Sequence, residues 1–454
     1  MSAPVLSIII LAVMFLLATV LPLNMGALAF VGAFLLGSVV LGMSTTDILA
    51  NFPGGLFLTI VGVTYLFAIA QNNGTIDLLV RGAVRLVGSK VSLIPWIMFA
   101  ITAVITAVGA LSPAAVAIIA PIALSFAARH KINPLMMGMM VIHGAQAGGF
   151  SPIAVYGVTV NGIIAKTELE ASPMAIFLAS FIFNLAIALV LFIVLGGNKL
   201  RSSGGGRLME QAAEKRMSVS VGARAAGVTL QGSGADISSG AGERAANGPS
   251  GTNARASVPQ LVTVLGLIAL AVISLGFKVD VGFVSITIAM VLALVSPAAQ
   301  KGAVNKISWS TVLLLCGMLT FVGVLEEAGT IKFVSDGVAQ LGMPLLAALL
   351  ICYIGAVVSA FASSTAILAA LIPLAVPFLA TGEVGAVGVI AALAVASTIV
   401  DVSPFSTNGA LVLANAHEDV DKDRFYKQIL AYSGIVVVAG PAVAWLVMVV
   451  PGWL

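Results

Sequence analysis

Long apolar segments alternate with short polar ones along most of the chain. Runs long enough to cross a bilayer cover 4–22, 25–43, 54–71, 173–197, 259–276, 281–298, 309–325 and 429–449. About 18 or more apolar residues with few charges are enough for a membrane-spanning helix. With 60% hydrophobic and 9% charged residues, the 454-residue chain is predicted to be an all-α polytopic membrane protein.

Two shorter segments, 74–90 and 328–342, have an amphipathic pattern instead. In each, polar residues recur every four positions opposite an apolar face, namely Asp77, Arg81 and Arg85, and Lys332, Asp336 and Gln340. A helix with this pattern lies in the membrane interface rather than crossing the bilayer. Both segments are therefore predicted to be interfacial helices.

Four further apolar segments are interrupted by proline, glycine and hydroxyl residues. We predict re-entrant helical hairpins at 92–128 and 344–380, and single broken spans at 134–165 and 384–416. Proline lacks a backbone N–H and clashes with the preceding turn, so a helix opens there. Open backbone at membrane depth is tolerated only when it is buried in protein or lines a wet cavity. The four breaks therefore mark the predicted functional site.

The second part of the chain repeats the plan of the first. Several anchors keep a spacing of 252 to 256 residues: Ser151-Pro152 with Ser403-Pro404, Pro121 with Pro373, Gly74 with Gly329, Gly62 with Gly317, and Gly26 with Gly282. We predict one repeat at 1–197, a second at 258–454, and between them a Gly- and Ser-rich flexible linker at 198–257. Each repeat has five spans plus one hairpin. Because five is odd, the two repeats are predicted to be inverted.

The distribution of basic residues predicts the orientation. With the linker in the cytoplasm, 18 of the 21 lysines and arginines lie on the cytoplasmic side, leaving Lys166, Lys278 and Lys332 outside. Both termini are then outside, in a membrane of the bacterial inner-membrane type. The small net charge of +3 gives no indication of a nucleic-acid partner.

Inverted repeats with discontinuous helices are typical of secondary transporters, which bind substrate and coupling ion between the repeats near the bilayer midplane. Opened helix N-termini suit anions, and opened C-terminal carbonyls suit Na⁺. The predicted substrate contacts are Ser112, Ser151, Ser364, Thr365, Ser403, Thr407 and Asn408. The predicted cation contacts are Gly148, Gly149, Ser363, Asp401 and Val402. No cofactor is expected beyond Na⁺ or H⁺ as a coupling ion.

Two ionisable residues have alternative interpretations. Asp401 could be a cation ligand, a proton-coupling group, or the neutral partner of a hydroxyl. We favour a cation or proton role, because a carboxylate at membrane depth is costly and by default functional. His143 could titrate during transport, or be a neutral histidine hydrogen-bonded between helices. The sequence leaves both readings of His143 open.

The paired breaks resemble those of the ion transporter superfamily that includes the divalent anion–sodium symporters. Two sequence segments are most similar to the malonate/dicarboxylate carrier, or MatC-type, branch. They are the segment from His143 to Asn161 and the segment Asp401-Val-Ser-Pro-Phe-Ser-Thr-Asn-Gly-Ala410. The symporters have Ser-Asn-Thr at both hairpin tips, and Ser363-Ser364-Thr365 keeps two of these three residues. The resemblance implies a homodimeric, elevator-type carrier of small dicarboxylates driven by a cation gradient.

Other functional classes fit the sequence less well. The chain has no Gly-x-Ser-x-Gly, His-Glu-x-x-His or phosphate-loop motif, which argues against an intramembrane enzyme or an ATP-driven pump. A channel needs a continuous lined pore, whereas hairpins and paired breaks suggest alternating access. A cation/proton antiporter of the same superfamily, with Asp401 as the exchanging group, remains the alternative.

The composition of the linker generates a first prediction. Deleting 202–255 is expected to leave transport activity largely intact, because a segment with no apolar period cannot contribute to a packed core. Transport by the shortened and full-length chains can be compared in liposomes at matched protein content. A shortened chain that is folded in the membrane but inactive contradicts this prediction.

Overall fold

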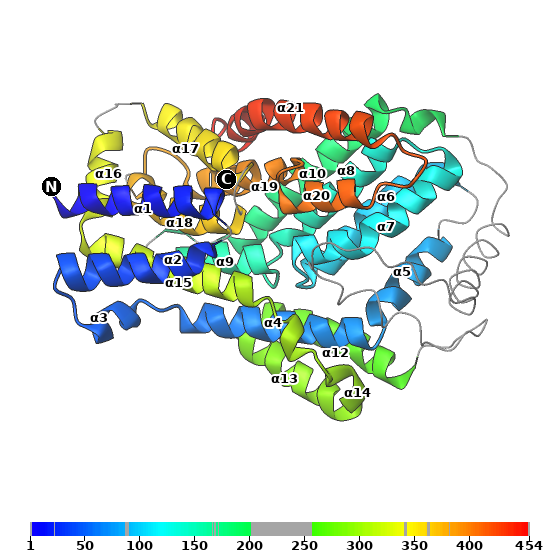
Figure 1. Cartoon of the computed structure of the whole chain (residues 1–454), viewed down its shortest axis with the longest axis horizontal. Coiled ribbons are helices and arrows are strands. Elements are labelled where there is room, and N and C mark those ends of the chain that lie inside the picture. The colour runs from blue at the N-terminus through cyan, green and yellow to red at the C-terminus, as the bar shows by residue number, and fades with distance from the viewer. Residues whose placement is uncertain are drawn as a thin grey trace, which may run out of the picture.

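The computed structural model describes residues 2–21, 23–86, 90–165, 167, 169–170, 172–200, 257–339, 343–360, 364–380 and 382–452. Within these ranges the regular elements are all helices, and most run along the long axis of the molecule (Figure 1). Seven of the described helices are long and apolar enough to cross a bilayer. The predicted all-helical membrane protein is confirmed, whereas most of the predicted linker lies outside the described residues.

The first half contains α1 (Ala3–Val20), α2 (Met25–Phe34), the π-helical turn η1 (Leu35–Val40), α3 (Thr45–Ala50), α4 (Gly54–Asn72), α5 (Thr75–Leu86), η2 (Val91–Leu93), α6 (Ile94–Ala107), α7 (Ser112–His130), α8 (Pro134–Gly149), α9 (Val155–Ile164), α10 (Pro173–Val194) and η3 (Gly197–Lys199). The second half contains α12 (Val258–Gly276), α13 (Val281–Val295), α14 (Pro297–Gln300), η4 (Val304–Lys306), α15 (Trp309–Glu327), α16 (Thr330–Ala339), α17 (Pro344–Ser359), α18 (Ser364–Leu379), α19 (Ala386–Ile399), η5 (Val400–Val402), α20 (Thr407–Ala414) and α21 (Lys422–Met448). The helix breaks fall where the sequence predicts them.

Among the helix boundaries that differ from the expected spans, two have a clear local cause. Helix α13 ends at Val295 rather than 298, because Pro297 starts the short helix α14 and holds Ser296 in a non-helical conformation. Helix α21 starts at Lys422, seven residues before the expected 429. The Asp421 side chain caps it by accepting hydrogen bonds from the first turn.

Glycine anchors of the predicted repeat meet pairwise where helices of the two halves cross. Helix α2 crosses α15, and a Cβ at Gly317 would meet the backbone of Gly26. Helix α4 crosses α13, and a Cβ at Gly62 would lie 2.9 Å from the carbonyl oxygen of Gly282. Small residues let membrane helices approach to backbone contact. The second span of each half therefore packs closely against the third span of the other half.

Each amphipathic helix also packs against the first span of the other half. Helix α16 packs on α1, where Ser7 Oγ and Thr330 Oγ1 are 2.6 Å apart. Helix α5 packs on α12, where the Asn73 amide donates to Thr263 Oγ1 at 2.6 Å. Figure 1 shows α5 and α16 near opposite ends of the long axis.

The buried side chains form two hydrophobic cores. The crossing core is built mainly from α1–α4 and α12–α15. The broken-helix core is built mainly from α6–α10 and α17–α21. Within the second, α8 and α19 are central, because the side chains of 135–149 and 388–399 are all buried. The helix breaks therefore lie at the ends of the most buried helices.

The glycine crossings generate a prediction about stability. Gly26→Ala is expected to destabilise the protein by about 1–3 kcal/mol, the usual cost of overpacking, because its Cβ would meet the backbone of Leu313. Thermal unfolding in detergent measures the effect. Gly434→Ala is the matched control, since a Cβ at Gly434 has open space around it. Equal melting temperatures for the two variants contradict the proposed close crossing.

Candidate substrate and ion site

The two broken spans open in the same way. In each loop, the serine before the proline donates its backbone N–H to the carbonyl three residues earlier at 3.1 Å, from Ser151 to Gly148 and from Ser403 to Val400. The backbone carbonyl of the same serine accepts a hydrogen bond from the backbone N–H three residues later, that of Ala154 at 2.8 Å and that of Ser406 at 3.0 Å. These turns satisfy part of the backbone that the breaks expose.

The second half-helices fold back tightly on these loops. A Cβ at Gly157, in the first turn of α9, would lie 2.7 Å from the Phe150 carbonyl oxygen. A Cβ at Gly409, in the first turn of α20, would lie 2.6 Å from the Val402 carbonyl oxygen. Only glycine leaves room for this approach at the two equivalent positions.

The hairpin tips lie at the starts of α7 and α18. Gly109 precedes the first tip with a φ of 126°, a conformation that favours glycine. At the second tip, Ser359 Oγ lies 2.8 Å from Ser364 Oγ and 2.6 Å from the carbonyl oxygen of Ser397. This contact ties the second hairpin to α19. Ser363, a predicted cation ligand, lies outside the described residues.

Each broken span contacts the hairpin of the other half. The Asn408 side-chain amide donates to Ser112 Oγ at 2.9 Å, joining α20 to α7. Helix α9 packs on α18, which brings the Tyr156 side chain to Thr365. Tyr156 and Asn408 are 252 residues apart and so occupy equivalent positions in the predicted repeat. The two hairpins and two broken spans thus form one connected site.

Asp401 is the acidic group of this site and is only 8% exposed. Its Oδ2 accepts from the Asn408 side-chain amide at 2.8 Å. The Ser406 hydroxyl lies beside it. Within the described part of the chain, no lysine, arginine or histidine forms a salt bridge with Asp401. Its negative charge is therefore held by hydrogen-bond donors alone.

Asn408 has unused hydrogen-bonding capacity. The residue is fully buried, and its Oδ1 has no hydrogen-bond partner among the described residues. A buried carbonyl oxygen without a partner loses the hydrogen bonds that it made to water, which costs free energy. The Asn408 amide nitrogen donates to both Ser112 and Asp401, so its Oδ1 is the acceptor of this side chain that remains unpaired.

Gly148 and Gly149 have packing roles that the sequence did not predict. A Cβ at Gly149 would lie 2.9 Å from the Tyr156 ring. The equivalent pair in the second half is Asp401 with Asn408. Where the second half pairs a carboxylate with an amide, the first half packs an aromatic ring on a glycine. A Cβ at Gly148 would meet the carbonyl oxygen of Ala103 on α6. Cation binding by these two glycines stays a prediction.

The remaining predicted contact residues are buried, with one exception. Ser112, Ser364 and Thr365 are buried at the hairpin tips, and Ser151, Ser403 and Val402 are buried in the breaks. Thr407 is exposed at the start of α20, and its role as a substrate contact stays a prediction. The sequence interpretation missed Tyr156. The repeat could have identified Tyr156, because it lies 252 residues before Asn408 and so occupies the equivalent position in the first half.

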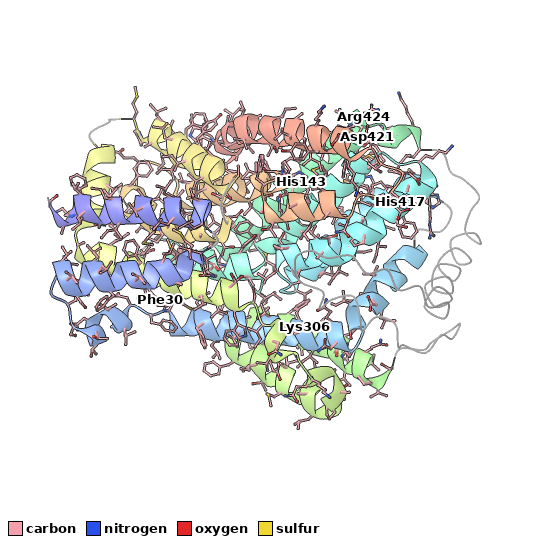
Figure 2. All side chains as sticks on the ribbon, viewed as in Figure 1. Phe30, His143, Lys306, His417, Asp421 and Arg424 are labelled. Carbon is pink, nitrogen blue, oxygen red and sulfur yellow. The ribbon has the colours of Figure 1, made fainter. Side chains whose placement is uncertain are left out.

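His143 lies apart from this cluster, between α8, α10 and α21, and is labelled near the middle of the molecule in Figure 2. The Asn184 amide donates to the Ser180 carbonyl at 2.9 Å, which orients Asn184 Oδ1 as an acceptor for His143 Nδ1 at 2.8 Å. His143 Nε2 then accepts from the Tyr432 hydroxyl at 2.7 Å. Of the two readings left open by the sequence, this geometry favours the neutral interhelical histidine.

The Gly149–Tyr156 contact generates a testable prediction. Gly149→Ala is expected to destabilise the protein by about 1–3 kcal/mol through overpacking against the ring. Combining it with Tyr156→Asn, the residue of the equivalent position, should cost less than the sum of the single changes. Unfolding measurements on the single and double variants test this. Gly162→Ala on α9 is the control, since a Cβ there meets nothing. Strictly additive effects contradict the contact.

Comparison with known proteins gives a family match for the first third of the chain. The model of the N-terminus of the dicarboxylate carrier protein MatC matches residues 1–149. This range contains the first hairpin and α8. No curated protein sequence matches the chain.

Two solved transporters have a similar fold. MtrF of Neisseria gonorrhoeae, from a class of antimetabolite efflux pumps, has a TM-score of 0.53 at 12% identity, covering 90% of this chain and 84% of its own. The YdaH transporter of Alcanivorax borkumensis, described as having an unusual topology, has a TM-score of 0.55 at 14% identity, covering 88% and 87%. At these identities the similarity concerns the fold. Together with the carrier-family match, the fold points to an integral membrane transporter and not to an enzyme.

Proposed function

We propose that this protein is a secondary active transporter of small dicarboxylates, of the malonate, malate and succinate class, coupled to Na⁺ or H⁺. The observation that carries the proposal is the pair of contacts between halves, the hydrogen bond from Asn408 to Ser112 and the packing of α9 on α18, which brings Tyr156 to Thr365. They join four helix breaks into one buried polar site. The match to the dicarboxylate carrier model supports the substrate class.

The substrate is expected to bind through helix ends and hydroxyls. Helices α7 and α18 begin at Ser112 and Ser364, and the first backbone N–H groups of a helix are donors that favour an anion. Ser151, Ser403 and Thr365 add hydroxyl groups close to the breaks. A dicarboxylate has two carboxylates, so one is proposed to bind to the elements of each half.

The coupling ion is proposed to bind at Asp401. This carboxylate has no salt-bridge partner among the described residues, and its hydrogen-bond partner Asn408 has an Oδ1 that lacks a hydrogen bond. A cation or a proton at this position offsets the buried negative charge. Bound cation would also reduce the repulsion between Asp401 and a dicarboxylate, which couples the two binding events.

Alternating access is proposed to be of the elevator type, between inverted halves. In this mechanism the broken-helix core moves against the crossing core, which the glycine contacts at Gly26 and Gly62 hold rigid. The placement of α5 and α16 near opposite ends of the molecule supports the inversion (Figure 1). We further propose a homodimer in a bacterial-type inner membrane, with both termini outside and the linker in the cytoplasm.

A cation/proton antiporter is the second candidate, and the buried Asp401 is the observation that favours it. Uptake of labelled malonate, malate and succinate into proteoliposomes, with a Na⁺ or a pH gradient, separates the two functions. The proposed carrier accumulates one of these acids when one gradient is imposed. An antiporter moves cations with no organic acid present, and that result without any acid uptake overturns the dicarboxylate proposal.

Asp401→Asn tests the coupling role. The variant is expected to lose at least about tenfold of gradient-driven uptake, as when a charged ligand that contributes about 1.4 kcal/mol or more is removed. Size-exclusion profiles check that it remains folded, and Glu383→Gln, at an exposed acid, is the matched control. Unchanged coupled uptake by a folded Asp401→Asn carrier contradicts the role.

A further inference from the structure

A groove distant from the connected site opens at one end of the helix bundle. It has a volume of about 740 Å³ and lies where α7 and α10 end and where α8 and α21 begin. Figure 2 shows Arg424 and Asp421, two of its lining residues, near this end of the molecule, apart from His143 in the middle. Because four apolar helices end here, the groove is at the level of a membrane–water interface.

The groove is lined by three basic and two acidic side chains. The Asp421 carboxylate accepts hydrogen bonds from the backbone N–H groups of Asp423 and Arg424, both at 3.1 Å, as the cap of α21. The Asp419 carboxylate lies 3.0 Å from His417 Nδ1. Both acids therefore have other partners.

The basic side chains are Lys131, Lys199 and Arg424. All three are exposed, and none forms a salt bridge with a described residue. Lys131 follows α7 in a left-handed backbone conformation with a φ of 53°, which residues other than glycine rarely adopt. The groove thus keeps three cations available to an anion.

The walls below these cations are apolar. Ile132, Leu195 and Phe425 line the groove. On α10, just before the groove, Val190 is 58% exposed and Val194 is 73% exposed, as expected for side chains that face lipid. Three exposed basic side chains with apolar neighbours, next to the exposed face of α10, fit a ligand with a phosphate head and hydrocarbon chains.

We propose that this groove is a binding site for an anionic phospholipid. The phosphate contacts Lys131, Lys199 and Arg424, and the acyl chains follow the exposed face of α10. Basic pockets between membrane helices attract anionic headgroups in this way. The lining elements all contribute to the broken-helix core. A bound lipid therefore ties α8, which leads into the first break, to α7, α10 and α21, independently of which solute the protein transports.

Native mass spectrometry of the full chain, with phosphatidylglycerol or phosphatidylcholine added, tests the proposal. Phosphatidylglycerol is expected to bind preferentially. The combined variant Lys131→Gln, Lys199→Gln and Arg424→Gln should weaken its binding at least about tenfold, since each cation near a membrane surface contributes about fivefold. Lys278→Gln with Lys301→Gln and Lys332→Gln removes the same charge at exposed positions elsewhere and should keep the adduct. Equal loss in both variants, or no lipid preference, overturns the proposal.

Soluble anions distinguish a lipid site from a general anion site. Glycerol 3-phosphate, inorganic phosphate and malonate at millimolar concentration are expected not to displace the phosphatidylglycerol adduct, because they lack acyl chains. Displacement by phosphate indicates a phosphate site and overturns the lipid assignment. Displacement by malonate indicates a solute entrance and also overturns it. These measurements record binding alone, so a negative result leaves the transport proposal untouched.

Discussion

Open backbone inside a membrane must find its hydrogen bonds within the protein, and this constraint governs the structure. Each unsatisfied peptide group in the hydrocarbon costs several kcal/mol. The breaks meet part of this demand locally, through turns centred on Ser151 and Ser403. Side chains from the opposite half stabilise the rest of the assembly, as Asn408 does at Ser112. Neither half can therefore form its part of the site alone.

The two halves use the same backbone for different chemistry. Gly157 and Gly409 pack on equivalent carbonyl groups, so the loops and half-helices have the same local arrangement. Seven residues before Tyr156 the first half has Gly149, which accommodates the ring. Seven residues before Asn408 the second half has Asp401, which accepts its hydrogen bond. One half thus supplies an aromatic wall and the other a charge, which lets a repeated scaffold form an asymmetric site.

The sequence was sufficient to predict the helix breaks but not the contacts between them. Proline and glycine act on the backbone locally, so the openings before Pro152 and Pro404 could be predicted from residue type and apolar pattern. The partner of Tyr156 could not, because an isolated tyrosine in an apolar run looks like an ordinary core residue. The substrate contact of Thr407 also stays a prediction. Its hydroxyl suggested a substrate contact, but its position on α20 leaves it exposed.

The connected site lies at the border between the two hydrophobic cores. On α9, Val155 belongs to the crossing core and Tyr156 to the broken-helix core. On α18, Ala366 belongs to the first and Leu368 to the second. A border between two separately packed units can shift with little loss of burial within either unit, whereas movement inside one core breaks close packing. The helices α9 and α18, which bring Tyr156 to Thr365, are therefore where relative motion of the cores would first reach the proposed substrate site.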